Sequence, residues 1–181
     1  MHALKRPILT TPRLIIRPYV LDDAPDLYEA ARESVDTVGS WLDWCHAGYV
    51  LEESEAFITG AIACWDMNIE FDFGIFRRSD QRLLGGCGLN QLEPSNGQGN
   101  VGYWIRTSEL GQGYAAEAGR RVTRFGFEKI HLRRIEICMA LENLASRAVA
   151  EKLGAAPEGV VKDRIAIRGS LYDGYLYALT G

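Results

Sequence analysis

A strand-to-helix turn with two glycines is the first place in this sequence where residue types and spacing favour chemistry. Gly111 and Gly113 follow an apolar segment, VGYWI at 101–105, and precede an alanine-rich stretch typical of a helix. A glycine leaves backbone N–H groups uncovered by any Cβ, and a helix start carries unpaired donors and a partial positive charge. Together these features predict a site for a phosphate-sized anion. Taken alone, the pattern has an alternative explanation as a tight strand-to-helix turn that binds no ligand, because glycine is common in turns.

The same turn does not match two well-known nucleotide motifs. It lacks the third glycine of the dinucleotide fingerprint, and no Gly-Lys-Ser or Gly-Lys-Thr follows it as in a phosphate-binding P-loop. The four cysteines, Cys45, Cys64, Cys87 and Cys138, are widely spaced and form no Cys-x-x-Cys pair. The sequence therefore predicts no metal site, and free thiols that behave as small apolar residues.

Length and charge limit the kinds of protein this chain can be. The 181 residues fit one domain over residues 1–181, with a formal net charge of −4. Nucleic-acid binders usually carry a basic excess, so we expect no nucleic-acid partner. No apolar run approaches the ~18 residues of a membrane-spanning helix, and the first residues contain no apolar leader segment. We therefore expect a cytoplasmic protein without membrane contact, for which a two-fold homodimer stays open.

Periodic apolar patterns predict the elements that must position the glycine turn. Residues 13–19 read as a strand, and helices are predicted after Asp22 and after Glu52, with a helical turn or two between 34 and 50. Then follow strands at 69–78, 83–92 and 100–106, a long helix, a strand at 133–140, a helix at 142–154 and a closing hairpin. This order predicts an α/β fold of the α+β type with a mixed sheet, unlike the regular alternation of a doubly wound nucleotide fold.

Four segments in this order resemble one family. GYWIRTSELGQGYAAEA at 102–118 is similar to the acetyl-CoA pyrophosphate loop of the GCN5-related N-acetyltransferase (GNAT) superfamily. N-x-x-S-x-x-V-x-E-K-x-G at 143–154 resembles a second motif of that superfamily. The opening TPRLIIRPYVLDDAPDLYE and the closing EGVVKDRIAIRGSLYDGYLYAL are similar to the subgroup that acetylates the N-termini of ribosomal proteins. The resemblance covers nearly the whole chain and is far more specific than the glycines alone.

The resemblance implies a fold and a cosubstrate site. The expected fold is a central, mostly antiparallel sheet with a splayed strand pair, flanked by helices. Acetyl-CoA is the implied cosubstrate, with its pantetheine arm beside Ile105 and Arg106 and its thioester carbonyl polarised by backbone amides in the splay. Ser108 departs from the Arg or Gln often found there, which removes a side-chain contact but not the backbone cradle. That cradle is expected to hold the pyrophosphate on the amides of Leu110, Gly111, Gln112, Gly113, Tyr114 and Ala115.

The implied proton-handling residues are partly unusual. Many family members use a Tyr in the second motif as general acid, and the matching position here is Ala150. The subgroup instead places a Ser at the position of Ser146, where its hydroxyl reaches the sulfur. Asn143 shares that helix face and either binds the pantetheine amide or a water, or simply caps the helix. Ser146 has an alternative too, as an ordinary hydroxyl on a helix surface.

The base and the acceptor are less determined by the sequence. The usual Glu in the strand before the loop corresponds to Asn100, and Glu93 is the nearest plausible carboxylate, with an exposed hairpin charge as its alternative. An α-amine with a pKa near ~8 is far more often neutral at neutral pH than a lysine at ~10.4, which favours a protein N-terminus as acceptor. A small amine (an amino acid, polyamine or antibiotic) and a CoA-binding module without turnover remain alternatives. Trp41, Trp44 and His46 are candidates for the wall of the acceptor pocket.

Overall fold

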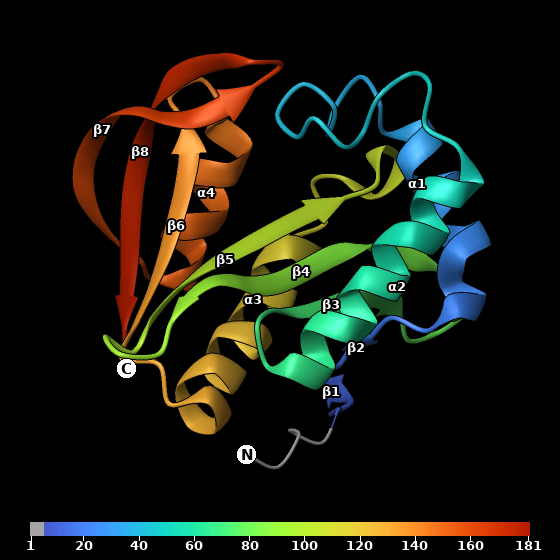
Figure 1. Ribbon diagram of the computed structural model, residues 1–181, viewed down its shortest axis with the longest axis horizontal. Helices are drawn as coiled ribbons and strands as arrows, with labels where there is room; N and C mark the ends of the chain where they lie inside the picture. Colours follow the sequence, from blue (N-terminus) through green and yellow to red (C-terminus); the bar gives the residue numbers. More distant parts are fainter. Residues whose placement is uncertain (1–5) are drawn as a thin grey trace.

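A computed structural model describes residues 6–181, which form an eight-stranded sheet with helices on both faces (Figure 1). The strands lie in the order β1-β2-β3-β4-β5-β6-β8-β7. Their bounds are β1 Leu9–Thr10, β2 Leu14–Pro18, β3 Phe71–Arg77, β4 Leu83–Glu93, β5 Gln98–Ile105, β6 Arg134–Ala140, β7 Ala156–Ile167 and β8 Ser170–Thr180. The helices are α1 Ala24–Glu33, α2 Leu51–Met67, α3 Tyr114–Phe125 and α4 Leu144–Leu153, with short turns η1 Leu21–Asp23, η2 Thr107–Glu109 and η3 Gly126–Ile130.

The predicted strands and helices are confirmed. Between α1 and α2 no continuous helix forms, but the amides of Val38 and Leu42 donate to Ser34 O and Val38 O at 2.8 and 3.0 Å, which gives the single helical turns expected between 34 and 50. This segment is a series of hydrogen-bonded turns around Gly39, where an added Cβ would lie 2.1 Å from the carbonyl oxygen of Cys45. The chain therefore folds back on itself too tightly for a helix to continue.

The expected splay lies between β5 and β6, the one parallel pair of the described sheet. The two strands pair only from Gln98 to Asn100 against Arg134 to Glu136. Beyond this point they diverge, as Figure 1 shows, and β6 continues with β8 as its antiparallel neighbour. The backbone of residues 101–105 is thus left without a strand partner on its β6 side.

Two apolar layers hold the helices against the sheet. On one face, Leu89, Val101 and Ile135 pack with Ala118 and Val122 of α3. On the other face, Phe76 and Leu83 pack with residues of α1 and α2 such as Leu27 and Ile58. The side chains of each strand alternate between these layers, so each strand residue is assigned to the α1–α2 face or to the α3–α4 face.

Candidate active site

The glycine turn presents a row of unpaired backbone donors. Gly113 caps α3 with φ 79°, and Gly111 has φ 76°, a left-handed conformation that suits glycine. The amides of residues 111–115 donate to no acceptor within residues 6–181, whereas the Leu110 amide donates to Thr107 O at 3.3 Å. Five consecutive free donors at a helix N-terminus form a cradle for an anion.

Arg13, at the start of β2, braces this turn from outside. Its Nη1 donates to Gln112 O at 3.1 Å and its Nε donates to Glu117 Oε2 at 2.7 Å. Its guanidinium also lies 4.6 Å from the centre of the Tyr114 ring. Arg13, Arg120 and Lys152 line a shallow hollow of about 470 Å³ beside Gly113, so the outer side of the cradle is positively charged.

A single cavity of about 1210 Å³ joins the glycine turn to the second motif. Leu110, Gly111, Gly113, Tyr114 and Ala115 line one part of it, and Ile105 lines the strand beside them. Asn143 and Ser146 line the same cavity further along. A long anionic ligand held at the turn can therefore extend to Ser146, which is the arrangement that the resemblance predicts.

Ser146 lies half-buried in the first turn of α4, beside a tyrosine that the sequence did not single out. The Tyr103 hydroxyl lies 3.1 Å from Ser146 Oγ and donates to Ser146 O at 3.0 Å. Burial raises the pKa of Tyr103 to about 12, so this hydroxyl stays protonated at neutral pH. The Ser146 amide donates to Asn143 Oδ1 at 3.0 Å, so Asn143 caps α4 while its Nδ2 makes no hydrogen bond to residues 6–181.

The position that carries a Tyr in many family members is Ala150 here, and it offers no group that could transfer a proton. Ala150 is fully buried in the layer between the sheet and α3. Burial also raises the pKa of the Cys87 and Cys138 thiols, which line the cavity. Both thiols therefore stay protonated at neutral pH and are poor nucleophiles, which agrees with direct attack on a thioester.

Two residues expected beside the cosubstrate do not line the cavity. The Gln112 side chain lies outside, and its carbonyl is the one that Arg13 binds. Arg106 is 2% exposed and points away from the cavity to the other side of the sheet, where it donates to Leu83 O at 3.1 Å and pairs with Glu29 and Glu33. The Arg106 side chain is held by two carboxylates of α1, so a pantetheine arm that runs beside Ile105 and Arg106, which stays a prediction, would meet only the backbone of Arg106.

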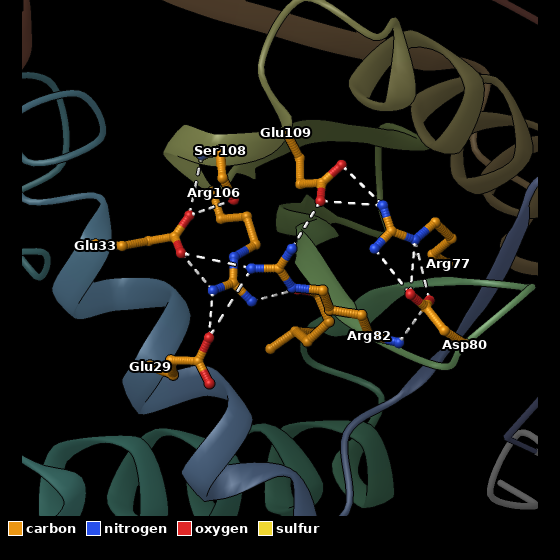
Figure 2. A network of polar contacts seen from close by, with 9 residues as sticks. Glu29, Glu33, Arg77, Asp80, Arg82, Arg106, Ser108 and Glu109 are labelled. Carbon is orange, nitrogen blue, oxygen red and sulfur yellow. Dashed lines mark hydrogen bonds and ion pairs between the residues drawn. The ribbon is translucent and has the colours of Figure 1, made fainter.

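Arg106 belongs to a polar network that anchors the entry to the glycine turn (Figure 2). Glu33 Oε1 accepts from both the amide and the hydroxyl of Ser108, at 3.0 and 2.9 Å. On the other side, Glu109 accepts from Arg77 and Arg82, each at 3.0 Å. The short turn η2, which leads into the cradle, is thus fixed to α1 and to the β3–β4 hairpin, and Ser108 serves this network.

The contacts of Glu33 in this network lead to a prediction about the stability of the fold. The guanidinium of Arg106 and the Ser108 donors lower the pKa of Glu33 to about 2, against an ordinary 4.5. Ionised Glu33 therefore stabilises the folded state, and this stabilisation is fully present above pH 4.5 and is lost as the pH falls toward 2. We expect Glu33→Gln to lower the free energy of unfolding by about 2 to 3 kcal/mol at pH 7. Urea unfolding should show this difference shrinking below pH 4.5, with Glu55→Gln, an exposed residue without an ion pair, as the unchanged control. A difference that does not depend on pH would contradict this role of Glu33.

The predicted base Glu93 is not in the cavity. It is exposed at the end of β4, where it accepts from Asn96 Nδ2 at 3.0 Å. This end of the sheet is where β5 and β6 still pair, so the side chain lies far from the open part of the splay. Asn100 does line the cavity, and its Nδ2 donates to Asn90 Oδ1 at 2.9 Å. A base at Glu93 is therefore wrong, and the carboxylate that reaches the cavity from the sheet is Asp72 of β3.

The far end of the cavity is aromatic. Trp41 and Trp44 line it, together with Tyr49, Phe57 and Trp104, while their place in the wall of an acceptor pocket stays a prediction. The rings of Trp44 and Trp104 meet edge to face with centres 5.1 Å apart. His46 does not line the cavity, and its Nε2 lies 3.0 Å from Glu53 Oε1.

Two negative findings concern the described part of the chain. Residues 6–181 contain no cluster of three or more His, Cys, Asp or Glu side chains placed to hold a metal ion. Among the same residues, no helix combines the length and apolar character needed to cross a membrane.

Comparisons with known proteins find the same architecture and family. A Vibrio cholerae structure assigned as a ribosomal-protein-serine acetyltransferase matches with a TM-score of 0.85 and 31% identity, covering 96% of this chain and 97% of that one. RimL, a ribosomal L7/L12 α-N-protein acetyltransferase solved in complex with coenzyme A, has the same fold, with a TM-score of 0.87 and 24% identity over 96% and 97% of the two chains. The N-acetyltransferase p20 of Bacillus licheniformis is 31% identical over 107 residues, which are 59% of this chain and 60% of p20.

The family model confirms the superfamily that the sequence resemblance indicated. The acetyltransferase (GNAT) domain matches residues 13–156, which include the glycine turn, the splayed strands and α4. This chain belongs to the acetyltransferase (GNAT) domain family, and with it to the N-acetyltransferases.

Proposed function

We propose that this protein transfers the acetyl group of acetyl-CoA to the N-terminal α-amine of a protein, with a ribosomal protein as the first candidate. The observation that carries the proposal is the single cavity that runs from the five free amides of the glycine turn, past Ser146, to an aromatic chamber. The residues present fit the cosubstrate, because free amides, a helix N-terminus and the nearby cations Arg13, Arg120 and Lys152 all suit its phosphates.

The residues around the thioester would act in three ways. Alternate amides of residues 101–105 point toward the splay, because the others face β4, and these amides are placed to stabilise negative charge on the acetyl oxygen. The Ser146 hydroxyl is placed to give a proton to the leaving sulfur, and Tyr103 holds that hydroxyl in position. Asn143 fixes the start of α4 and thereby the position of Ser146.

A protein N-terminus as acceptor is supported by the chemistry of amines and by the relatives. Near neutral pH roughly a tenth of α-amines are neutral, but well under a thousandth of lysine side chains. The V. cholerae protein named above is assigned as a ribosomal-protein-serine acetyltransferase. The aromatic chamber, bounded by Trp41, Trp44 and Phe57, offers apolar contact for the first side chains of a peptide.

An acetylation screen tests this function. Octapeptides with each of the common N-terminal residues would be incubated with acetyl-CoA beside spermidine and free amino acids, and products would be identified by mass spectrometry. We expect mono-acetylation at the α-amine of a subset of peptides. Acetylation of spermidine or amino acids alone would contradict a protein acceptor, and release of no product from either set would favour a CoA-binding module without turnover.

A further inference from the structure

Asp72 on β3 carries a carboxylate that the fold does not use. Its backbone carbonyl accepts from Trp65 Nε1 at 2.9 Å, but within residues 6–181 nothing donates a hydrogen bond to its side chain. The side chain is nevertheless half-buried and lines the cavity of the candidate active site. Buried carboxylates are normally hydrogen-bonded, so an unpartnered one facing a cavity indicates a ligand.

The register of the sheet aims this carboxylate at the splay. Asp72 lies beside Gly88 of β4, which in turn lies beside Gly102 of β5. An added Cβ on Gly88 would stand 2.3 Å from Asp72 Oδ1, so the carboxylate leans over β4 in space that only glycine leaves free. Strands are ~4.8 Å apart, which puts the carboxylate about one strand from β5, the strand that borders the splay.

The surroundings of Asp72 give it the properties of a base at neutral pH. Burial, with a smaller contribution from Glu70, raises its pKa to about 6. The other titratable groups close enough to interact with it are Tyr19, Cys64 of α2 and, on the opposite face of the sheet, Cys87 of β4, and none of these is a cation. At pH 7 the carboxylate is therefore mostly ionised and free to accept a proton, which is the condition for efficient general-base catalysis.

We propose that Asp72 binds the ammonium group of the acceptor and takes its proton, which makes the amine nucleophilic. The inference rests on the proposed acetyl transfer and supplies the base that Asn100 and Glu93 do not. The neutral nitrogen then attacks the acetyl carbon, the C–N bond forms and the C–S bond breaks. The second proton of the nitrogen leaves with the sulfur as the CoA thiol, by way of Ser146, and the proton on Asp72 returns to solvent. Proton transfer from the amine to Asp72 is direct or passes through one water.

Asp72→Asn tests this role, because the amide keeps the size of the side chain but cannot take a proton. With a peptide from the acetylation screen, or with spermidine, we expect kcat/KM for the acceptor to fall about 100-fold. The Kd of acetyl-CoA should change less than about 2-fold, since Asp72 lies on the face away from α3. The rise of kcat/KM through pH 6 that we expect in the wild type should disappear, and a thermal unfolding scan should show an intact fold.

Glu70→Gln is the matched control. Glu70 precedes β3 and does not line the cavity, but its charge raises the pKa of Asp72. We expect this variant to keep its turnover and to shift the acidic limb of the pH profile to lower pH. A merely structural role of Asp72 would not move that limb.

The outcomes separate this inference from the proposed function. Full activity and an unchanged acidic limb in Asp72→Asn would overturn the role of Asp72 and leave acetyl transfer standing. Acetylation of spermidine but of no peptide would overturn the protein acceptor, while the Asp72 comparison is still decided with spermidine. No transfer to any amine by the wild type would contradict both.

Discussion

Gly113→Val is expected to weaken acetyl-CoA binding by about 100-fold or more, because it disturbs the hydrogen bonds that the backbone amides of the cradle would donate to the charged phosphates. Gly113 has φ 79°, a conformation that is strained for a β-branched residue. The nearest protein atom to an added Cβ is Arg13 Nη2, at 3.9 Å, so the side chain would not clash inside the fold. The loss would come instead from a shift of the backbone and from a Cβ standing beside the free amides. Isothermal titration with acetyl-CoA measures the effect.

Gly169→Val is the matched control for this experiment. Gly169 has φ 76° and nothing within 4 Å of an added Cβ, so the substitution carries the same backbone strain in the β7–β8 turn. It does not line the cavity. We expect both variants to lose similar thermal stability and only Gly113→Val to lose affinity. Equal affinities in the two variants would mean that the cradle does not bind the cosubstrate.

Ser146→Ala is expected to lower kcat about 10- to 100-fold with little change in the Kd of acetyl-CoA, the usual range for loss of a single acid. The hydroxyl is the donor that the cavity offers near the leaving sulfur, because Ala150 is buried where many relatives carry a Tyr. The substitution leaves the Ser146 amide bonded to Asn143, so α4 keeps its cap. Steady-state kinetics with the acceptor from the screen measures the change.

Tyr103→Phe tests whether the Tyr103 hydroxyl positions the hydroxyl of Ser146. It removes the hydrogen bonds to Ser146 O and Oγ but leaves the serine in place. We expect a smaller loss of kcat than in Ser146→Ala, because a misplaced donor still reaches the sulfur part of the time. An unchanged kcat in Ser146→Ala would remove this serine from the mechanism.

Much of the fold follows from patterns within single segments. The alternation in residues 133–140 predicts β6, and the two glycines before an alanine-rich stretch predict the start of α3 at Tyr114. The cradle and Ser146 could be located from short motifs, since each depends on residues that are neighbours in the chain. The splay was expected from the family resemblance, and the short β5–β6 pairing confirms it.

The residues that sequence reasoning missed depend on contacts between distant segments. Asp72 reads as an ordinary polar position in IEFDFG, and its role emerges only because the register sets it beside Gly88 and Gly102. Tyr103 is 43 positions from Ser146, and nothing local links the two. The ion pairs of the Arg106 side chain were missed because strand period does not show which carboxylates of α1 lie behind it. Such pairings need the three-dimensional packing of β5 against its neighbours.

A crystal structure with coenzyme A bound tests the central claim most directly. The account predicts that the diphosphate oxygens accept hydrogen bonds from the amides of residues 111–115. It also predicts that the chain of the cofactor follows Ile105 through the splay and that its sulfur lies within hydrogen-bonding distance of Ser146 Oγ. Coenzyme A bound without contact to the glycine turn, or with its sulfur directed away from Ser146, would contradict the account.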